Sequence, residues 1–280
     1  MILDGKVVAA SIKEQLKEEI DAAVANGGRR PKLVIISIGD DPASKVYVRN
    51  KMKAAEEVGI EVEHLPYEDD VGTFYVREVI QYRNLDSKVD GIMVQLPLPG
   101  GYNEREIIDT IFPWKDVDGL TTTNIGRLRS GQDCLKPCTA QGIIDLCKYY
   151  DIELDGKDVT IVGRSNIIGK PLADLMMTEG ATVTQCHSHT KQLQNHTDYA
   201  DIVVSAIGQP KFITDFHVHG CQTVIDVGIN RDENGKLCGD VDFDEVKDFV
   251  ENITPVPGGV GPMTVAELMK NVVQAWKNNY

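Results

Sequence analysis

The sequence lacks any apolar run long enough to span a bilayer, and its first residues, MILDGKVVAA, contain no basic stretch that leads into an apolar one. We therefore expect neither a membrane anchor nor an export signal, and we predict a cytoplasmic protein.

Basic residues are also scarce, since 29 Lys and Arg stand against 43 Asp and Glu and leave a formal net charge of −14. A field of this sign repels nucleic acid and anionic membranes, so we expect neither as a partner.

Cysteine is sparse, and its spacing indicates neither disulfides nor zinc. Six cysteines are scattered over 280 residues, and none forms a C-x-x-C pair. This usage is typical of reduced thiols in a chain large enough to need no cross-links. The densest group of possible metal ligands is Cys186, His187 and His189, at the end of an expected strand. Adjacent and alternate residues there point in different directions, and no second pair of donors follows at a zinc-like spacing, so we expect no metal site.

Short β-branched runs alternate with segments of helical periodicity through most of the chain, which predicts an α/β fold with mainly parallel sheets. Strands are expected at 33–38, 60–65, 91–96, 155–163, 181–186, 201–207 and 222–228. Helices are expected at 12–24, 42–58, 73–84, 139–149 and 262–277. Asp41 and Gly59 have the residue types of an N-cap and a left-handed C-cap around the second helix. The sequence after Pro97 is rich in turn residues.

The order of these elements predicts two lobes and a returning helix. Residues 1–139 form an N-terminal α/β lobe, and residues 140–262 form a Rossmann-like lobe of the dinucleotide-binding kind. The last segment, 263–280, carries Val265, Leu268, Met269 and Val272 on one helical face and is expected to pack back across the lobes.

The first chemical signal is Gly163-Arg-Ser-Asn-Ile-Ile-Gly169, between an expected strand and a helix. Glycines at such a junction allow a pyrophosphate close to the backbone, and the helix N-terminus offers N–H groups to it. A plain glycine-rich turn has the same pattern, but Arg164 adds a planar fork suited to phosphate. The next strand ends in CHSHT (186–190), without the acidic residue that binds the ribose of NAD. His187, Ser188 and His189 could instead accept a 2′-phosphate, so the sequence favours NADP.

The second signal is the pair Tyr47 and Lys51, four residues apart on an expected helix and therefore on one face. Tyr-x-x-x-Lys serves proton transfer in some enzymes, because a partly desolvated lysine can exchange a proton near neutral pH. An ordinary exposed helix face is the alternative, since three more basic residues lie nearby. Short-chain dehydrogenases use the same pair, but their coenzyme loop precedes it, so the reversed order here argues against that fold.

Two further segments could line a site. Gln95 lies at the end of the strand GIMVQL, where open α/β sheets bind ligands, and Asp118 lies in the loop PWKDVDGL. Asp116 and Asp118 could equally be turn residues. Residues 254–264, TPVPGGVGPMT, are expected to be non-helical, and they suit either close approach to a flat ligand or a crossing between lobes.

Seven ordered blocks, DDPASKVYVRNK, VQLPLP, KDVDGL, KPCTAQG, VGRSNIIGKP, DVGIN and PVPGGVGPMT, resemble the bifunctional methylenetetrahydrofolate dehydrogenase/methenyltetrahydrofolate cyclohydrolase family. The resemblance covers essentially the whole chain. It departs at Ala140-Gln141, where proline is common, and at His189, where Arg or Lys is usual. It implies oxidation of 5,10-methylenetetrahydrofolate by NADP, followed by hydrolysis to 10-formyltetrahydrofolate, in one cleft between the lobes of a homodimeric enzyme.

The resemblance also implies residue roles. Lys51 would transfer protons, Tyr47 would lie against the folate, Gln95 would orient Lys51, and Asp118 would anchor the pterin. The other implied contacts with the folate substrate are Val94, Leu96, Pro257, Gly258 and Gly259, in part from a segment, 255–263, that closes over both ligands. The implied contacts with the coenzyme NADP are Gly163, Arg164, Ser165, Ser188 and Ile229.

Two other classes of protein remain open from the residues. One is a different NADP oxidoreductase with a similar two-lobe frame, such as an amino-acid dehydrogenase, but it accounts for neither VQLPLP nor KDVDGL. The other is a non-catalytic folate or nucleotide binder, in which Lys51 and Gln95 need not occur together.

Overall fold

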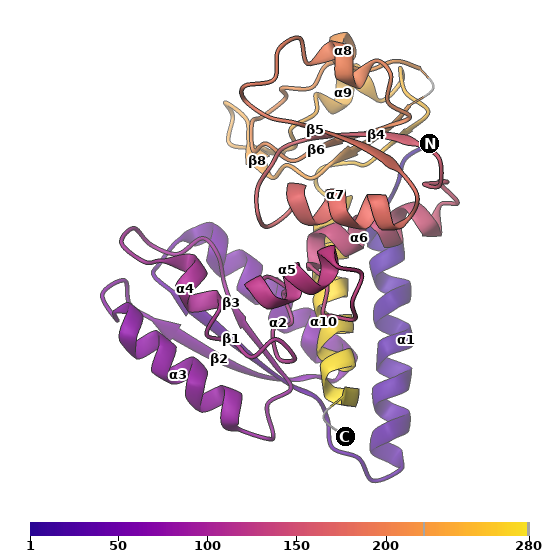
Figure 1. The fold of residues 1–280 in the computed structure, drawn as a ribbon. Helices are drawn as coiled ribbons and strands as arrows, with labels where there is room; N and C mark the ends of the chain where they lie inside the picture. The colour runs from indigo at the N-terminus through magenta and orange to yellow at the C-terminus, as the bar shows by residue number, and fades with distance from the viewer. Residues whose placement is uncertain (221, 279–280) are drawn as a thin grey trace. The chain divides into compact units, whose positions relative to one another are not determined.

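The computed structural model describes residues 1–220 and 222–278, and the chain divides into two compact units (Figure 1). The first unit contains Ala10–Cys138 together with the chain from Val265 onward. The second unit contains Met1–Ala9 and Thr139–Thr264. Two helices, α1 (Gly5–Ala25) and α10 (Val260–Asn278), begin in the second unit and continue in the first. The α/β fold with parallel sheets is confirmed.

The first unit is built on a three-stranded parallel sheet with the order β2-β1-β3. The strands are β1 (Lys32–Ile38), β2 (Glu61–Tyr67) and β3 (Gly91–Val94). Leu33 and Ile35 of β1 pack on one face with α1, α10 and α2 (Pro42–Val58). Val34 and Ile36 pack on the other face with α3 (Thr73–Leu85) and α4 (Glu104–Ile108). Because both faces of the sheet are covered, β1 is a continuous apolar run rather than an alternating one.

Helix α2 begins and ends at the predicted residues. The Asp41 carboxylate accepts a hydrogen bond from the Ser44 N–H at 2.7 Å, which caps the first turn. Gly59 has φ 87°, and its N–H donates to the Ala55 carbonyl, so the helix ends in a left-handed cap. These two ends set the register that places Tyr47 and Lys51 one turn apart.

The second unit is a Rossmann-like layer with five parallel strands in the order β10-β7-β6-β4-β5. The strands are β4 (Asp158–Val162), β5 (Thr182–Cys186), β6 (Ile202–Ser205), β7 (Thr223–Asp226) and β10 (Asn252–Ile253). Its helices are α6 (Cys138–Tyr149), α7 (Gly169–Thr178), α8 (Gln194–Thr197), the 3₁₀ turn Asp215–His217 and α9 (Phe243–Val246). A short hairpin of β8 (Asn230–Arg231) and β9 (Leu237–Cys238) follows β7.

Several boundaries differ from the sequence prediction. Residues 1–9, assigned above to the lobe 1–139, lie in the second unit because the Leu3 N–H donates to the Ile253 carbonyl at 2.8 Å. The expectation that 254–264 is entirely non-helical is wrong, since α10 begins at Val260. Pro262 is compatible with that start because the N–H groups of a first helical turn need no partner within the helix. The turn-rich region after Pro97 contains two short helices, α4 and α5 (Thr122–Arg129).

The structure also describes most of the cysteines, the longest apolar helices and the groups of possible metal ligands. Cys134, Cys138, Cys147, Cys186 and Cys238 are free thiols, and Cys221 lies outside the described residues. Within residues 1–220 and 222–278, no helix is long and apolar enough to cross a membrane. The same part of the chain has no group of three or more His, Cys, Asp or Glu side chains placed to hold a metal ion.

Candidate active site

A buried pair, Lys51 and Gln95, forms the centre of the candidate site in the first unit. The Lys51 Nζ donates a hydrogen bond to the Gln95 Oε1 at 3.1 Å, although the residues are 44 apart in sequence. Both side chains are buried, at 8% and 7% exposed. The lysine amine is thus removed from water and faces a neutral amide oxygen rather than a carboxylate.

The Gln95 side chain is held at both ends. Gln95 is the first residue after β3, and its N–H donates to the Ile36 carbonyl of β1 at 2.8 Å. Its Nε2 donates to the Leu96 carbonyl at 2.6 Å, which leaves Oε1 turned toward Lys51. The amide orientation is therefore set by the chain itself rather than by a ligand.

The residues on either side of Gln95 and the ring of Tyr47 differ in what they can offer to a ligand. The Val94 side chain is 3% exposed and belongs to the core on the α3 face of the sheet. Any contact of Val94 with a substrate would therefore involve its backbone. Leu96 is half-buried and remains available as an apolar side chain. Tyr47, one turn before Lys51, is also half-buried, and this burial raises the pKa of its phenol.

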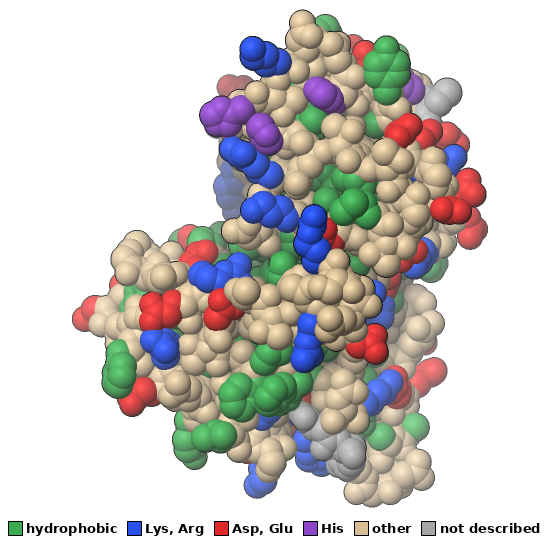
Figure 2. Space-filling model, viewed as in Figure 1, with side chains coloured by type: hydrophobic (Ala, Val, Ile, Leu, Met, Phe, Trp, Pro, Cys, Tyr) green, Lys and Arg blue, Asp and Glu red, His purple; other side chains and the backbone are tan. Residues whose placement is uncertain are grey.

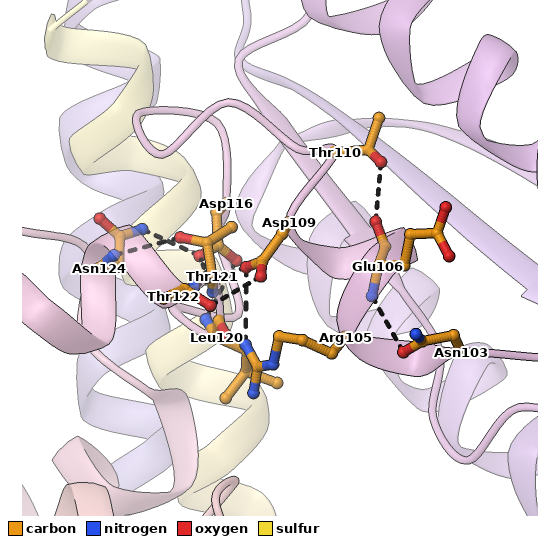
Figure 3. A network of polar contacts seen from close by, with 10 residues as sticks. All are labelled: Asn103, Arg105, Glu106, Asp109, Thr110, Asp116, Leu120, Thr121, Thr122 and Asn124. Atoms are coloured by element: carbon orange, nitrogen blue, oxygen red, sulfur yellow. Dashed lines mark hydrogen bonds and ion pairs between the residues drawn. The ribbon is translucent and has the colours of Figure 1, made fainter.

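The two carboxylates of the loop PWKDVDGL have different surroundings. Asp116 is buried and accepts hydrogen bonds from the N–H groups of Leu120 and Thr121 and from the Asn124 amide, so it closes the turn that leads into α5 (Figure 3). Burial raises the pKa of Asp116, and these donors oppose that rise. Asp118 is half-buried and has no hydrogen-bond partner among the described residues. Asp116 is thus a turn residue, and Asp118 is free to bind a ligand.

Asn271 of α10, which the sequence analysis did not single out, holds the loop that carries Asp118. Its Nδ2 donates to the Val117 carbonyl at 2.8 Å and to the Lys136 carbonyl at 2.9 Å. The Cys138 thiol donates to the same Val117 carbonyl at 3.2 Å. Burial, together with the negative charge of Asp118, raises the pKa of the Cys138 thiol well above its usual value. Cys138 is therefore a structural donor rather than a nucleophile.

In the second unit, the turn after β4 has the geometry expected for a phosphate site. Gly163 has φ 139°, and a Cβ there would lie 2.4 Å from the Ala206 carbonyl oxygen. A Cβ at Gly169 would lie 2.4 Å from the Gly163 oxygen. Only glycine fits either position, so the backbone of the turn is bare at the N-terminus of α7. This arrangement fits a dinucleotide.

The side chains around this turn are exposed and polar. Arg164 and Ser165 are exposed, and the Ser165 Oγ accepts from the Ile168 N–H at 3.1 Å. After β5, Ser188 and His189 are exposed, and the His189 N–H donates to the His187 Nδ1 at 3.1 Å. Figure 2 shows histidine and basic side chains gathered along one edge of this unit. In a chain of net charge −14, such an edge suits a phosphate.

The remaining predicted contacts follow β7 and β10. Ile229 is 46% exposed, so its aliphatic side chain is accessible to a ligand. Pro257 is exposed, whereas Gly258 and Gly259 are buried. A Cβ at Gly5 would lie 1.9 Å from the Gly259 oxygen, so the start of α1 packs directly on this backbone.

A groove of 1140 Å³ runs along α2 and the outer strand β2. Its lining includes Lys45, Arg49 and Lys53 and, of the predicted site residues, Gln95 alone. Lys45 pairs with Asp40, and Arg30 pairs with Asp21, so the charges of the groove are largely balanced internally.

Comparisons with known proteins show the family of the chain. Residues 3–118 match the family model "Tetrahydrofolate dehydrogenase/cyclohydrolase, catalytic domain", and residues 137–280 match the NAD(P)-binding domain of the same family. The Bifunctional protein FolD of Agathobacter rectalis is 49% identical over 276 residues, which cover 99% of each chain.

Solved structures agree with these sequence matches. The structure of bifunctional FolD from Campylobacter jejuni has a TM-score of 0.97 and 43% identity, and the match covers 100% of this chain and 99% of that one. FolD from Trypanosoma brucei, solved with NADP cofactor and inhibitor, has a TM-score of 0.94 and 36% identity, with 99% and 97% of the chains covered. The chain therefore belongs to the tetrahydrofolate dehydrogenase/cyclohydrolase family and is a bifunctional enzyme of that family.

Proposed function

We propose that this enzyme oxidises 5,10-methylenetetrahydrofolate with NADP and hydrolyses the methenyl product to 10-formyltetrahydrofolate, with Lys51 as the proton-transfer residue. The observation that carries this proposal is the buried hydrogen bond between the Lys51 amine and the neutral Gln95 amide. Neither an amino-acid dehydrogenase nor a passive folate binder accounts for this pair together with both family domains.

The oxidation step needs alignment more than acid or base catalysis. The reacting methylene lies between two nitrogens whose lone pairs stabilise the cation that remains after hydride departure. NADP, when bound, supplies the hydride acceptor. The protein's part is to orient the folate, for which Tyr47 offers a half-buried ring and Asp118 a carboxylate that has no hydrogen-bond partner in the described part of the chain. That carboxylate can accept paired hydrogen bonds from the amino-amide edge of the pterin and reject analogues without those donors.

The hydrolysis step needs a group that moves a proton twice. Water adds to the methenyl carbon and loses a proton, and the bond from this carbon to N5 then breaks while N5 takes up a proton. The second proton of the water is released, so the neutral formyl product balances the cationic substrate. Lys51 can accept the first proton and return it to N5, because its amine is held in place by Gln95.

The coenzyme would lie on the second unit at the ends of β4, β5 and β7. Arg164, Ser165 and Ser188 are exposed there and can bind phosphate oxygens, with Ile229 against an apolar part of the coenzyme. The absence of an acidic residue after β5 supports NADP over NAD, as does the NADP complex of the Trypanosoma brucei relative. Pro257, Gly258 and Gly259 would contribute a close backbone surface to the ligands.

The decisive experiment is an absorbance assay of the purified protein with 5,10-methylenetetrahydrofolate and NADP, which reads NADPH and methenyl formation separately. Lys51→Met should abolish hydrolysis of methenyltetrahydrofolate and leave folate binding intact. Lys53→Met is the matched control, because this exposed lysine lies on the same helix and carries the same charge. If folate affinity falls in proportion to the hydrolysis rate, Lys51 is a binding residue and its proposed role is wrong.

A homodimer is a further proposal that rests on the family resemblance, and a cytoplasmic location is one that rests on the sequence argument above. Analytical ultracentrifugation of the purified protein would test the first, and a monomer at assay concentration would contradict it.

A further inference from the structure

A second buried polar centre lies in the second unit, under the carboxyl ends of β6 and β7. Asp240 follows the hairpin β8-β9 and is fully buried. One of its oxygens, Oδ2, accepts from the Ile207 N–H at 2.7 Å, the Gly208 N–H at 3.2 Å and the Ser205 hydroxyl at 3.3 Å. This single carboxylate therefore organises the whole turn that follows β6.

The other oxygen of Asp240 reaches a different segment. Oδ1 accepts from the Gln209 N–H at 2.9 Å and from the Asn230 Nδ2 at 2.8 Å. Asn230 directly follows Ile229, the exposed side chain assigned to the coenzyme. Asp240 thus ties the turn after β6 to the turn after β7, and five donors compensate its burial.

Asp226, the last residue of β7, holds the backbone around Asp240 by hydrogen bonds. Its carboxylate accepts from the N–H groups of Gly228, Asp240 and Val241, each at 2.9 Å. The Asp226 N–H donates to the Thr254 hydroxyl at 2.7 Å, at the start of the segment that leads to Pro257. The backbone of Asp240 is therefore held by Asp226, while the side chain of Asp240 holds the two turns.

Two glycines make room for this arrangement. A Cβ at Gly228 would lie 2.2 Å from the Asp240 Oδ1, and a Cβ at Gly239 would lie 1.7 Å from the Asp226 Oδ2. The two carboxylates thus occupy the space that side chains would take at these positions. Gly228 immediately precedes Ile229, so this packing reaches the coenzyme side of the turn.

The turn after β6 borders the phosphate turn directly. The Cβ position of Gly163 lies 2.4 Å from the carbonyl oxygen of Ala206, the residue before the turn that Asp240 organises. Because Asp240 already occupies the N–H groups of residues 207–209, those groups are not a free anion site. Their function is to fix a surface, and a surface fixed in advance binds its ligand more tightly.

We propose that Asp240, held by Asp226, is a positioning residue that presents Ile229 and the turn after β6 to the coenzyme. The proposal rests on the proposed function for the identity of the coenzyme. It assigns Asp240 no contact with NADP and no part in hydrolysis of methenyltetrahydrofolate, which needs no coenzyme and uses Lys51 of the first unit.

The test is Asp240→Asn in the full-length protein. An amide has one acceptor oxygen, so it cannot satisfy the donors that surround Asp240, and its NH₂ group would face backbone N–H groups. We expect the Kd of the reduced coenzyme, measured by NADPH fluorescence, to rise about tenfold or more, with a matching rise in KM for NADP. The cyclohydrolase rate should stay within about twofold, because the first unit is unchanged.

Two more variants keep the test decisive. Asp244→Asn removes the same charge from a side chain that is 81% exposed, and it should leave NADP binding unchanged. Asn230→Ala removes only the 2.8 Å hydrogen bond to Asp240 and leaves the buried carboxylate with four donors, so this variant should fold. Its affinity for NADP should fall by about threefold to tenfold. If Asp240→Asn does not fold, Asn230→Ala decides the question.

The outcomes separate this proposal from the assigned activity. Unchanged NADP affinity in folded Asp240→Asn, or in Asn230→Ala when Asp240→Asn does not fold, overturns the proposal. Equal losses of NADP binding and cyclohydrolase rate also overturn it, since they indicate a general structural role. An unmodified protein without either folate activity would contradict the proposed function, yet its NADP titration would still test the role of Asp240.

Discussion

Gln95→Glu places a carboxylate 3.1 Å from the Lys51 amine in place of a neutral amide oxygen. If Lys51 must exchange a proton during hydrolysis, this change should hold the amine in its ammonium form and block that exchange. Hydride transfer does not use this proton, so the two activities should respond differently.

The distance gives the size of the effect. Two unit charges at this separation attract by about 5 kcal/mol at an effective dielectric constant of about 20. Burial of the new carboxylate, at a side chain that is 7% exposed, offsets part of that gain. A net preference of about 3 kcal/mol for the ammonium form corresponds to about a hundredfold loss of cyclohydrolase rate at neutral pH.

The assay measures both rates on one purified variant from about pH 6 to about pH 9. Cyclohydrolase activity should recover as the pH rises, dehydrogenase activity should fall less, and methenyltetrahydrofolate should accumulate near neutral pH. Gln95→Leu is the control, because it removes the hydrogen bonds to Lys51 and to the Leu96 carbonyl without adding charge. Parallel losses of both activities, with no methenyl accumulation, would refute the proton-control role and leave Gln95 as a residue that positions the substrate.

Three other predictions concern coenzyme choice, the Asp118 loop and pH. Arg164→Ala should raise the KM for NADP by about tenfold to a hundredfold in steady-state assays and leave the KM for NAD nearly unchanged. Equal increases for both coenzymes would place this guanidinium on the shared pyrophosphate. Asn271→Ala should lower the free energy of unfolding by about 1–3 kcal/mol in urea titrations and raise the KM for folate, since the Lys136 carbonyl loses its Asn271 donor and the Val117 carbonyl keeps only the Cys138 thiol. An unchanged KM would show that the loop holds without Asn271. Burial raises the pKa of Asp226 from 3.8 to about 7, so its contribution to the free energy of unfolding should fall as the pH rises through this range, by about 4 kcal/mol at most. Asp226→Asn should lack that slope, and identical slopes in urea titrations at several pH values would contradict the assignment.

Local chemistry explains why part of the fold could be predicted from the sequence. The ends of α2 depend on Asp41 and Gly59, which act on backbone groups within a few residues of themselves. Residues 33–36 of β1 are a continuous apolar run because both faces of the sheet are covered, and that run is visible in the sequence. Such short-range signals do not show where a chain terminus packs. The sequence prediction therefore places residues 1–9 in the first unit, whereas they lie in the second.

The site divides in the same way. The α/β class, the shared helix face of Tyr47 and Lys51 and the glycines of the phosphate turn can be predicted from the chain, because they depend on residue type and short spacing. Three contacts are visible only in the folded protein: Lys51 meets Gln95, Asn271 holds the Val117 carbonyl from 154 residues away, and Asp240 joins two turns. A buried hydrogen bond between distant segments depends on how strands and helices pack, and neither periodicity nor spacing along the chain carries that distance.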